Sequence, residues 1–395
     1  MTSSDDVVVV GAARTPYGRM NGGLSSVTAP QLGAHAIRAA LDQGDVDPGR
    51  VDAVYLGHAL PAGCGQNPAR RAALAAGIGP RAHASAVNKV CLSGLTAIID
   101  ATRLLRTGEA GVVVAGGLES MSRAPHLLPG VRSGWTYGDR TAVDHMAHDG
   151  LTDAEQGISM GLLTEADAQR LGITRGQQDA VAAASHRRAA TAAAEGRFTA
   201  EIAPVTISGR KGETVISADE GVRADSTTET LGRLRPAFDD GGTITAGNAS
   251  PISDGGAAVV LTTRRQAADH RWQVLATVGT TGQVAGPDSS LPAQPARAIT
   301  AALDRARWGV ADLDLIEINE AFAVVAVQST TELGVAPERV NPDGGAIALG
   351  HPIGSSGARL VVHAAHELHR RGQGRAAVGL CGGGGQGEAL LLEHS

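Results

Sequence analysis

The chain has 395 residues, with 34 Lys and Arg against 40 Asp and Glu, and a formal net charge of −6. This acidic balance, without a basic run, argues against a nucleic-acid or anionic-membrane partner. No stretch approaches the ~20 consecutive apolar residues of a membrane-spanning helix. The three widely spaced cysteines fit a reducing, cytoplasmic setting better than a disulfide framework or a zinc site.

The first part of the chain alternates between strand-like and helix-like segments. Continuous apolar runs predict the strands, and apolar residues at helical spacing predict the helices between them. The predicted strands span 7–10, 51–56, 84–90 and 112–115, and the predicted helices span 30–44, 67–77 and 92–107. Unbroken apolar strands between helices indicate an α/β fold whose sheets are covered on both faces.

The middle of the chain differs in character from the first part. Residues 128–153 are rich in loop-forming residues, and an Ala-rich helix follows. That helix is predicted to begin at the capping box Thr174-x-x-Gln177 and to stop near Gly196. Residues 255–261 then form another apolar, strand-like run.

The last part of the chain repeats the first. The segment Ala36–Asp42 recurs at residues 298–304 with a single difference, an offset of 262. Further along, Ser93-Gly94 recurs as Ser356-Gly357 at an offset of 263. An offset that stays nearly constant over this distance indicates an internal repeat.

We infer a tandem duplication, roughly of residues 6–120 and 270–392, with an insertion between the copies. The strand predicted over 255–261 would return to the sheet of the first copy. The predicted units are a first core half, an inserted loop domain and a second core half, spanning 1–120 plus 250–268, 121–249 and 269–395.

Two reactive side chains occupy matching strand-to-helix junctions. Cys91 lies between a predicted strand and a predicted helix, where unpaired N–H groups and the helix dipole are expected to lower the pKa of the thiol. His351 lies at nearly the same place in the second copy, between glycines that leave room for the ring to face a cleft. A neutral imidazole there could deprotonate a thiol. Either residue, taken alone, could equally be an ordinary buried side chain.

Two more candidates follow strands of the second copy. Cys381 opens a run of four glycines, Gly382–Gly385, whose backbone N–H groups could hold an oxyanion. Asn319 directly follows the strand-like segment 313–318 and could hold a water or simply cap a helix. Because α/β sheets build their sites at the carboxyl ends of strands, the four residues together suggest acyl transfer through a thioester.

At these residues the sequence resembles the thiolase family over nearly its whole length. The resemblance implies a five-layered αβαβα fold, built from two duplicated core domains with a loop domain inserted in the first. It rests on five motifs in order, which are Cys91-Leu92-Ser93-Gly94, Gly116-Gly117-Leu118-Glu119-Ser120-Met121-Ser122, Asn319-Glu320-Ala321-Phe322, Gly350-His351-Pro352 and Cys381-Gly382-Gly383.

The resemblance also implies catalytic roles. Cys91 would take the acyl group, and His351 would activate it and polarise the thioester carbonyl. Cys381 would act as acid and base on the second substrate. Asn319 would hold a water that forms one oxyanion hole with His351, and the backbone N–H groups of Cys91 and Gly383 would form the other. No metal or redox cofactor is implied.

The inserted segment resembles the coenzyme A-binding loop domain of the family. Arg223 would lie near the adenine nucleotide and Ser250 near the pantetheine. Met160, Ser159 and Phe322 would line the substrate site. Ser159 departs from the His that short-chain biosynthetic members commonly carry there, which leaves the acyl chain length open.

By this resemblance the chain is expected to be an acyltransferase that condenses two acetyl-CoA to acetoacetyl-CoA and CoA, or runs the reverse. The alternative is a degradative 3-ketoacyl-CoA thiolase of fatty-acid β-oxidation with a broader chain length. A remote alternative is a non-catalytic acyl-CoA binder or lipid-transfer protein. Family members are homodimers or homotetramers, and residues 125–150 would form the tetramer contact. We expect a cytoplasmic protein without a nucleic-acid or membrane partner.

Overall fold

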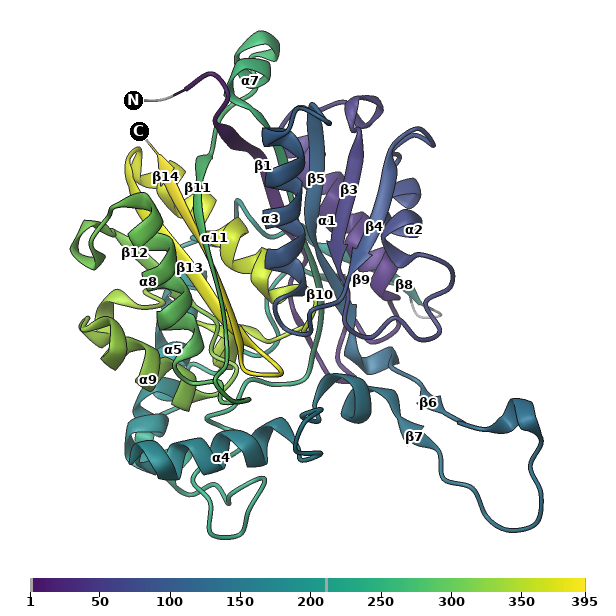
Figure 1. The fold of residues 1–395 in the computed structure, drawn as a ribbon, viewed down its shortest axis with the longest axis vertical. Coiled ribbons are helices and arrows are strands. Elements are labelled where there is room, and N and C mark those ends of the chain that lie inside the picture. Colours follow the sequence, from purple (N-terminus) through teal and green to yellow (C-terminus); the bar gives the residue numbers. More distant parts are fainter. Residues whose placement is uncertain (1–2, 210–211, 395) are drawn as a thin grey trace.

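The computed structural model describes residues 3–209 and 212–394, which build one large mixed sheet with helices on both faces (Figure 1). The strands of this sheet are β1 (Val7–Arg14), β2 (Gly18–Arg19), β3 (Ala53–Gly57), β4 (His83–Val87), β5 (Val112–Ser120), β10 (Ser253–Thr263), β11 (Ala276–Ala285), β12 (Leu315–Ile318), β13 (Gly374–Gly382) and β14 (Gln386–His394). They follow the order β12-β13-β14-β11-β1-β10-β5-β3-β4, and β2 pairs with β10.

The sheet has two halves of matching topology. In the first half β5 pairs in parallel with β3 and antiparallel with β10, and in the second half β13 pairs in the same way with β12 and β14. The halves join where β1 and β11 share only the pairs Val8↔Thr277 and Val9↔Ala276. This match confirms the predicted duplication, and β10 returns to the first half as predicted.

Helices cover the outer faces of both half-sheets and fill the space between them. The helices around the sheet are α1 (Ala29–Gln43), α2 (Pro68–Ala75), α3 (Ser93–Arg106), α7 (Arg264–His270), α8 (Gln294–Ala306), α9 (Ala323–Leu333), α10 (Ala346–Leu349) and α11 (Ser356–Arg371). Helices α1 and α2 pack on the outside of the first half, and α8 and α9 on the outside of the second. Helices α3 and α11 lie between the halves.

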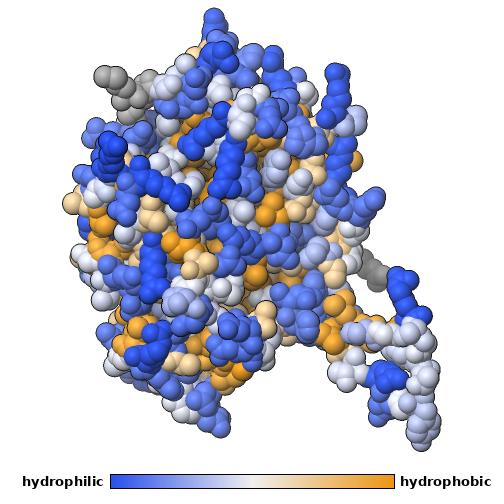
Figure 2. All heavy atoms as spheres, viewed as in Figure 1, coloured by the Kyte–Doolittle hydropathy of each residue, from blue (hydrophilic) through white to orange (hydrophobic). Residues whose placement is uncertain are grey.

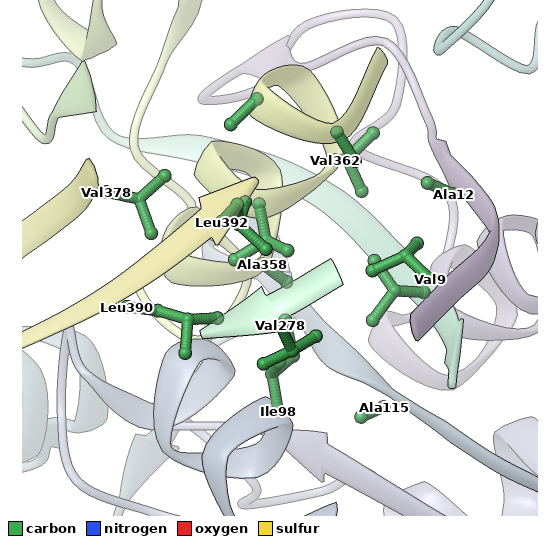
Figure 3. Packing of buried hydrophobic residues seen from close by; sticks show 14 of the residues in the cluster. Val9, Ala12, Ile98, Ala115, Val278, Ala358, Val362, Val378, Leu390 and Leu392 are labelled. Carbon is green, nitrogen blue, oxygen red and sulfur yellow. The ribbon is translucent and has the colours of Figure 1, made fainter. Parts of the chain in front are cut away.

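The packing of strand β1 explains why its sequence is an unbroken apolar run. Alternate side chains of a strand point to opposite faces. Val8 and Val10 therefore face the outer core with α1, whereas Val7 and Val9 face the inner core. In the inner core, Val9 lies with Ile98 of α3 and Val362 of α11 (Figure 3). With α1 and α2 outside the first half-sheet, α3 and α11 between the half-sheets, and α8 and α9 outside the second, the layers run αβαβα.

The first-half strands differ from prediction at their ends. Strand β5 continues through Gly116 and Gly117 to Ser120, because these glycines keep their pairing with Ala258 and Ala257 of β10. Strand β4 stops at Val87, earlier than predicted, because the chain turns sharply before Cys91.

The segment between the halves contributes separate helices and hairpins. Its elements are β6 (His126–Leu127), β7 (Val143–Asp144), a π-helical turn (Met146–Gly150), α4 (Met160–Leu171), α5 (Arg175–Ala194), β8 (Val205–Gly209), β9 (Gly212–Ile216) and α6 (Thr228–Gly232). Helix α5 begins at the capping box of Thr174 and Gln177, as predicted. Strands β6 and β7 carry an arm that projects from the body (Figures 1 and 2).

A buried arginine ties this segment to the core. Arg14 at the end of β1 is fully buried, and its guanidinium donates to both carboxylate oxygens of Asp219 at 2.6 and 2.9 Å and to Glu201 at 2.8 Å. A paired, bidentate arrangement is what a buried guanidinium requires, because an unpaired charge there would be strongly destabilising. The inserted chain around Asp219 is therefore held in a fixed position against β1.

At one point the two halves approach each other backbone to backbone. A Cβ added at Gly117 of β5 would lie 1.9 Å from the carbonyl oxygen of Gly354, which belongs to the second half. Position 117 corresponds to Cys381 in the repeat, so a side chain is possible in one copy and excluded in the other. Among residues 3–209 and 212–394, no helix combines the length and apolar character needed to cross a membrane.

We predict that Gly117→Ala destabilises the protein by at least about 1–3 kcal/mol, because the added Cβ would meet a backbone carbonyl, which cannot turn aside as a flexible side chain could. Gly176→Ala is the matched control, since Gly176 lies in α5 with no atom near its added Cβ and should change stability by less than about 1 kcal/mol, in the favourable direction. Urea unfolding measures both. Equal midpoints for the two variants would contradict the close approach.

Candidate active site

The turn that carries Cys91 has a strained backbone and is held by hydrogen bonds. Val90, just before it, has a φ of +50°, a conformation that β-branched residues rarely adopt and that surrounding contacts must enforce. Ser93, the first residue of α3, supplies them. Its hydroxyl donates to the carbonyl of Val90 at 2.6 Å and accepts from the N–H of Lys89 at 2.8 Å. The thiol is thus fixed at the start of α3.

A buried carboxylate links this turn to the second half of the molecule. Glu388 of β14 is fully buried and accepts from Lys89 Nζ at 2.6 Å, Thr96 Oγ1 at 2.7 Å and Gln283 Nε2 at 2.6 Å. The residue before it, Gly387, pairs with Cys381 in the β13–β14 hairpin. The Cys91 turn and the Cys381 strand are therefore held to each other.

His351 follows the short helix α10 and is held on several sides. Its backbone N–H donates to Ser253 Oγ at 3.1 Å, and its Nδ1 lies 2.6 Å from Ser356 Oγ. The loop that follows is tied to the first half by Glu119, whose carboxylate accepts from the N–H groups of Gly354 and Ala59, each at 2.9 Å. The motif that contains Glu119 therefore fixes the position of the imidazole relative to the first half.

A cavity of about 330 Å³ joins the predicted catalytic residues. Cys91, His351, Cys381 and Gly383 all line it. Of the predicted substrate contacts, it is also lined by Ser159, Met160, Ser250 and Phe322. Residues from the two halves, such as Cys91 and Cys381, which are 290 positions apart in the chain, thus meet in one space.

Asn319 does not line this cavity. It is fully buried beyond the imidazole, with its Nδ2 at 3.5 Å from His351 Nδ1, and its Oδ1 has no hydrogen-bond partner among the described residues. The side chain thus neighbours His351, as predicted, but it contacts the nitrogen on the Ser356 side of the ring. The water-holding role implied by the resemblance remains a prediction.

The electrostatics of the site follow from burial. Burial raises the pKa of the Cys91 thiol to about 12, and hydrogen bonds from the backbone N–H groups of Gly383 and Cys91 oppose this only in part. Burial, followed by the proximity of Cys91, raises the pKa of Cys381 well above its usual range. Burial, followed by Arg359, lowers the pKa of His351 to about 4. At neutral pH both thiols are protonated and the imidazole is neutral.

The lowered thiol pKa expected from the helix terminus was therefore wrong for the substrate-free protein. The sequence argument weighed the helix dipole, which favours a thiolate, but local sequence does not reveal how far the site is desolvated. Desolvation is the larger effect here. At neutral pH, catalysis would therefore need a nearby base to take the proton of the thiol.

Sequence reasoning missed much of the apolar wall of the cavity. Leu151 and Phe238 from the inserted segment, and Leu291 and Ile353 from the second half, lie on it. One signal was present in the sequence. A Cβ at Gly161 would lie 2.4 Å from the ring of Phe238, and a glycine at a helix start can indicate such a close approach.

A second cleft of about 590 Å³ shares lining residues with the catalytic cavity. The predicted residues Arg223 and Ser250 lie on it, and Ser250 lines both spaces. His186 of α5, which the sequence did not suggest, also lines it and accepts from the N–H of Arg223 at 3.2 Å. The cleft therefore leads from a basic outer region to the reactive thiols.

Comparison with known families decides which proteins the chain resembles. Residues 7–265 match the family model described as the thiolase N-terminal domain, and residues 272–394 match that of the thiolase C-terminal domain. The chain belongs to the thiolase family.

Individual thiolases match along almost their whole length. A probable acetyl-CoA acetyltransferase of Mycolicibacterium smegmatis is 53% identical, covering 98% of this chain and 100% of the relative. An acetyl-CoA acetyltransferase of Pseudomonas aeruginosa is 46% identical, with 98% and 99% covered. The crystal structure of the Bacillus anthracis acetyl-CoA acetyltransferase superposes with a TM-score of 0.94 at 39% identity, covering 98% of each chain. The thiolase fold predicted from the motifs is thus confirmed.

The raised thiol pKa predicts a steep pH dependence in this thiolase. In the substrate-free protein, alkylation of Cys91 by iodoacetamide should rise about tenfold per pH unit from pH 6 to 9, because the thiolate fraction rises in that proportion below the pKa. Peptide mass spectrometry resolves Cys91 from Cys64 and Cys381. A rate that levels off below pH 7 would show a lowered pKa and contradict the desolvation argument.

Proposed function

We propose that this thiolase is an acetyl-CoA acetyltransferase, which condenses two acetyl-CoA to acetoacetyl-CoA and free CoA or runs the reverse. The observation that carries this conclusion is the single cavity shared by Cys91, His351 and Cys381 at the inner end of a cleft. Relatives named acetyl-CoA acetyltransferase, at 45–53% identity, support the same activity. A non-catalytic binder would not need this set of reactive groups.

The first step transfers an acetyl group to the protein. The neutral imidazole of His351 takes the proton of Cys91, and the sulfur attacks the thioester carbonyl. The backbone N–H groups of Cys91 and Gly383 face this sulfur and can stabilise the oxyanion. CoA then leaves as a thiolate, takes a proton, and Cys91 carries the acetyl group.

The second step forms the carbon–carbon bond. Because the pKa of Cys381 is raised, its thiol is protonated at rest and can give its proton to the departing CoA. The resulting thiolate is a strong base that removes a proton from the methyl carbon of a second acetyl-CoA. That carbon attacks the acetyl group on Cys91, and the Cys91 sulfur leaves and regains a proton. These steps need coenzyme A thioesters and the side chains described.

The coenzyme A moiety is proposed to lie in the outer cleft, with the inserted segment 121–249 supplying most of its contacts. Arg19 and Arg223 line this cleft and suit phosphate groups, whereas Ser250 and Phe238 line both the cleft and the inner cavity. The Arg14–Asp219 contact, four residues before Arg223, holds this wall against the core.

A longer-chain degradative thiolase is the alternative, and Ser159 favours it. The small side chain lines the cavity, and its hydroxyl accepts from the N–H of Leu162 at 3.2 Å, so it caps α4. The neighbouring walls are apolar, which suits an alkyl chain.

We also propose that the protein is a cytoplasmic homotetramer or homodimer. Trp135 and Tyr137 on the projecting arm are 48% and 103% exposed, although the chain has only nine aromatic residues other than histidine. Exposed apolar groups on a projecting arm are typical of subunit contacts. Sedimentation velocity of Trp135→Ser against the unchanged chain tests whether the arm joins subunits.

Acetyl-CoA alone should leave one acetyl group on Cys91, because Cys91 is the thiol that accepts it in the proposed first step. Intact-mass spectrometry of the protein after a brief incubation detects it. Cys91→Ala should abolish the adduct, and Cys64→Ala is the control that should retain it. An adduct that survives Cys91→Ala would remove the basis of the proposed function.

If acetyl transfer is the main activity, thiolysis of acetoacetyl-CoA should exceed that of a C8 3-ketoacyl-CoA in kcat/KM by at least about tenfold, which corresponds to about 1.4 kcal/mol. Ser159→Phe should depress the C8 reaction more than the C4 reaction, because the added ring fills the cavity. Equal or better rates on C8 would favour the degradative alternative.

A further inference from the structure

The duplicated halves place a serine at the start of each central helix. Ser93 begins α3 and Ser356 begins α11, and the two positions correspond in the repeat. Both side chains are fully buried. The Ser93 hydroxyl makes hydrogen bonds across the turn that carries Cys91, as described above. Ser356 occupies the same place beside His351, but its hydroxyl contacts the imidazole itself.

The hydrogen-bond geometry around Ser356 determines where the imidazole proton lies. The hydroxyl is 2.9 Å from the carbonyl oxygen of Pro352, which can only accept, and 2.6 Å from His351 Nδ1. A serine hydroxyl has a single proton to donate. Donating it to Pro352, in the usual backbone contact of a serine near a helix start, leaves the oxygen to accept from Nδ1–H.

Asn319 cannot replace this partner. Its Nδ2 lies 3.5 Å from the same ring nitrogen, at the outer limit of hydrogen bonding, and an amide nitrogen donates but does not accept. Within residues 3–209 and 212–394, Ser356 Oγ is thus the acceptor available to a proton on Nδ1.

We propose that Ser356 is a positioning residue that keeps the His351 proton on Nδ1 and leaves the lone pair of Nε2 facing the cavity. This inference rests on the proposed function, because it concerns the step in which His351 takes the proton of Cys91. Once Nε2 carries that proton, the ring is a cation with N–H groups on both nitrogens, and Ser356 still accepts from Nδ1. The serine therefore favours both the resting tautomer and the charged state that follows.

The neighbouring serine provides a matched control. Ser355 is also fully buried and lies in the same turn, but its hydroxyl is 2.8 Å from the Tyr17 hydroxyl and makes no contact with the imidazole. Ser355→Ala and Ser356→Ala remove the same atom from adjacent positions. Arg359, whose charge lowers the pKa of the ring, Asn319, which neighbours Nδ1, and the cavity-lining thiols of Cys91 and Cys381 are unchanged in both variants.

Ser356→Ala should lower kcat at least about tenfold with little change in KM, because the loss is confined to proton transfer. The rate at which acetyl-CoA acetylates Cys91 in a single turnover should also become about tenfold slower at each point of its pH profile, because that step passes the thiol proton to His351. Ser355→Ala should keep the original profile even if it unfolds at a lower temperature. Ser356→Thr, which retains the oxygen, should recover most of the rate.

The outcomes separate this proposal from the proposed function. If acetyl-CoA acetylates Cys91 in the unchanged protein and the Ser356→Ala and Ser355→Ala profiles coincide, the role of Ser356 is refuted while the acetyl transfer stands. If the unchanged protein forms no acetyl adduct, the proposed function itself fails. Should Ser356→Ala not fold, long-range ¹⁵N NMR of histidine-labelled protein still decides the point, because a proton on Nε2 at neutral pH would overturn the proposal.

Discussion

The close backbone approach between the two halves is the constraint on which the site depends. Gly117 meets the carbonyl of Gly354 at a distance that leaves no room for a side chain, and Glu119 adds hydrogen bonds from the same strand to the Gly354 loop. These contacts set the loop of His351 against the first half. The distance between the imidazole and Cys91 therefore depends on them, and proton transfer is sensitive to shifts of about 1 Å.

The duplication gives a symmetric framework that the site uses asymmetrically. Equivalent positions carry Gly117 in one copy and Cys381 in the other, so the packing role and the chemical role are divided between them. The serines at the starts of α3 and α11 likewise have different roles. One holds a backbone turn and the other holds an imidazole. In the proposed mechanism each half supplies only part of the chemistry, and the reaction requires both.

Much of this organisation could be predicted from the sequence, because the repeat of Ala36–Asp42 and the junctions at Cys91 and His351 are local patterns. The raised thiol pKa could not, since desolvation arises from segments distant in the chain. The place of Asn319 outside the cavity was also hidden, because a strand end defines an edge of the sheet but not the packing of a side chain there. Walls such as Phe238 come from the inserted segment, which has no repeat to guide its placement.

The central claim is that a thiol from one half is activated by an imidazole from the other to carry the acyl group. Rapid-quench kinetics with excess acetyl-CoA tests it most directly. The account predicts that one CoA is released per active site in a first phase, before acetoacetyl-CoA appears. Release of CoA and acetoacetyl-CoA together, with no first phase and no lag, would contradict it.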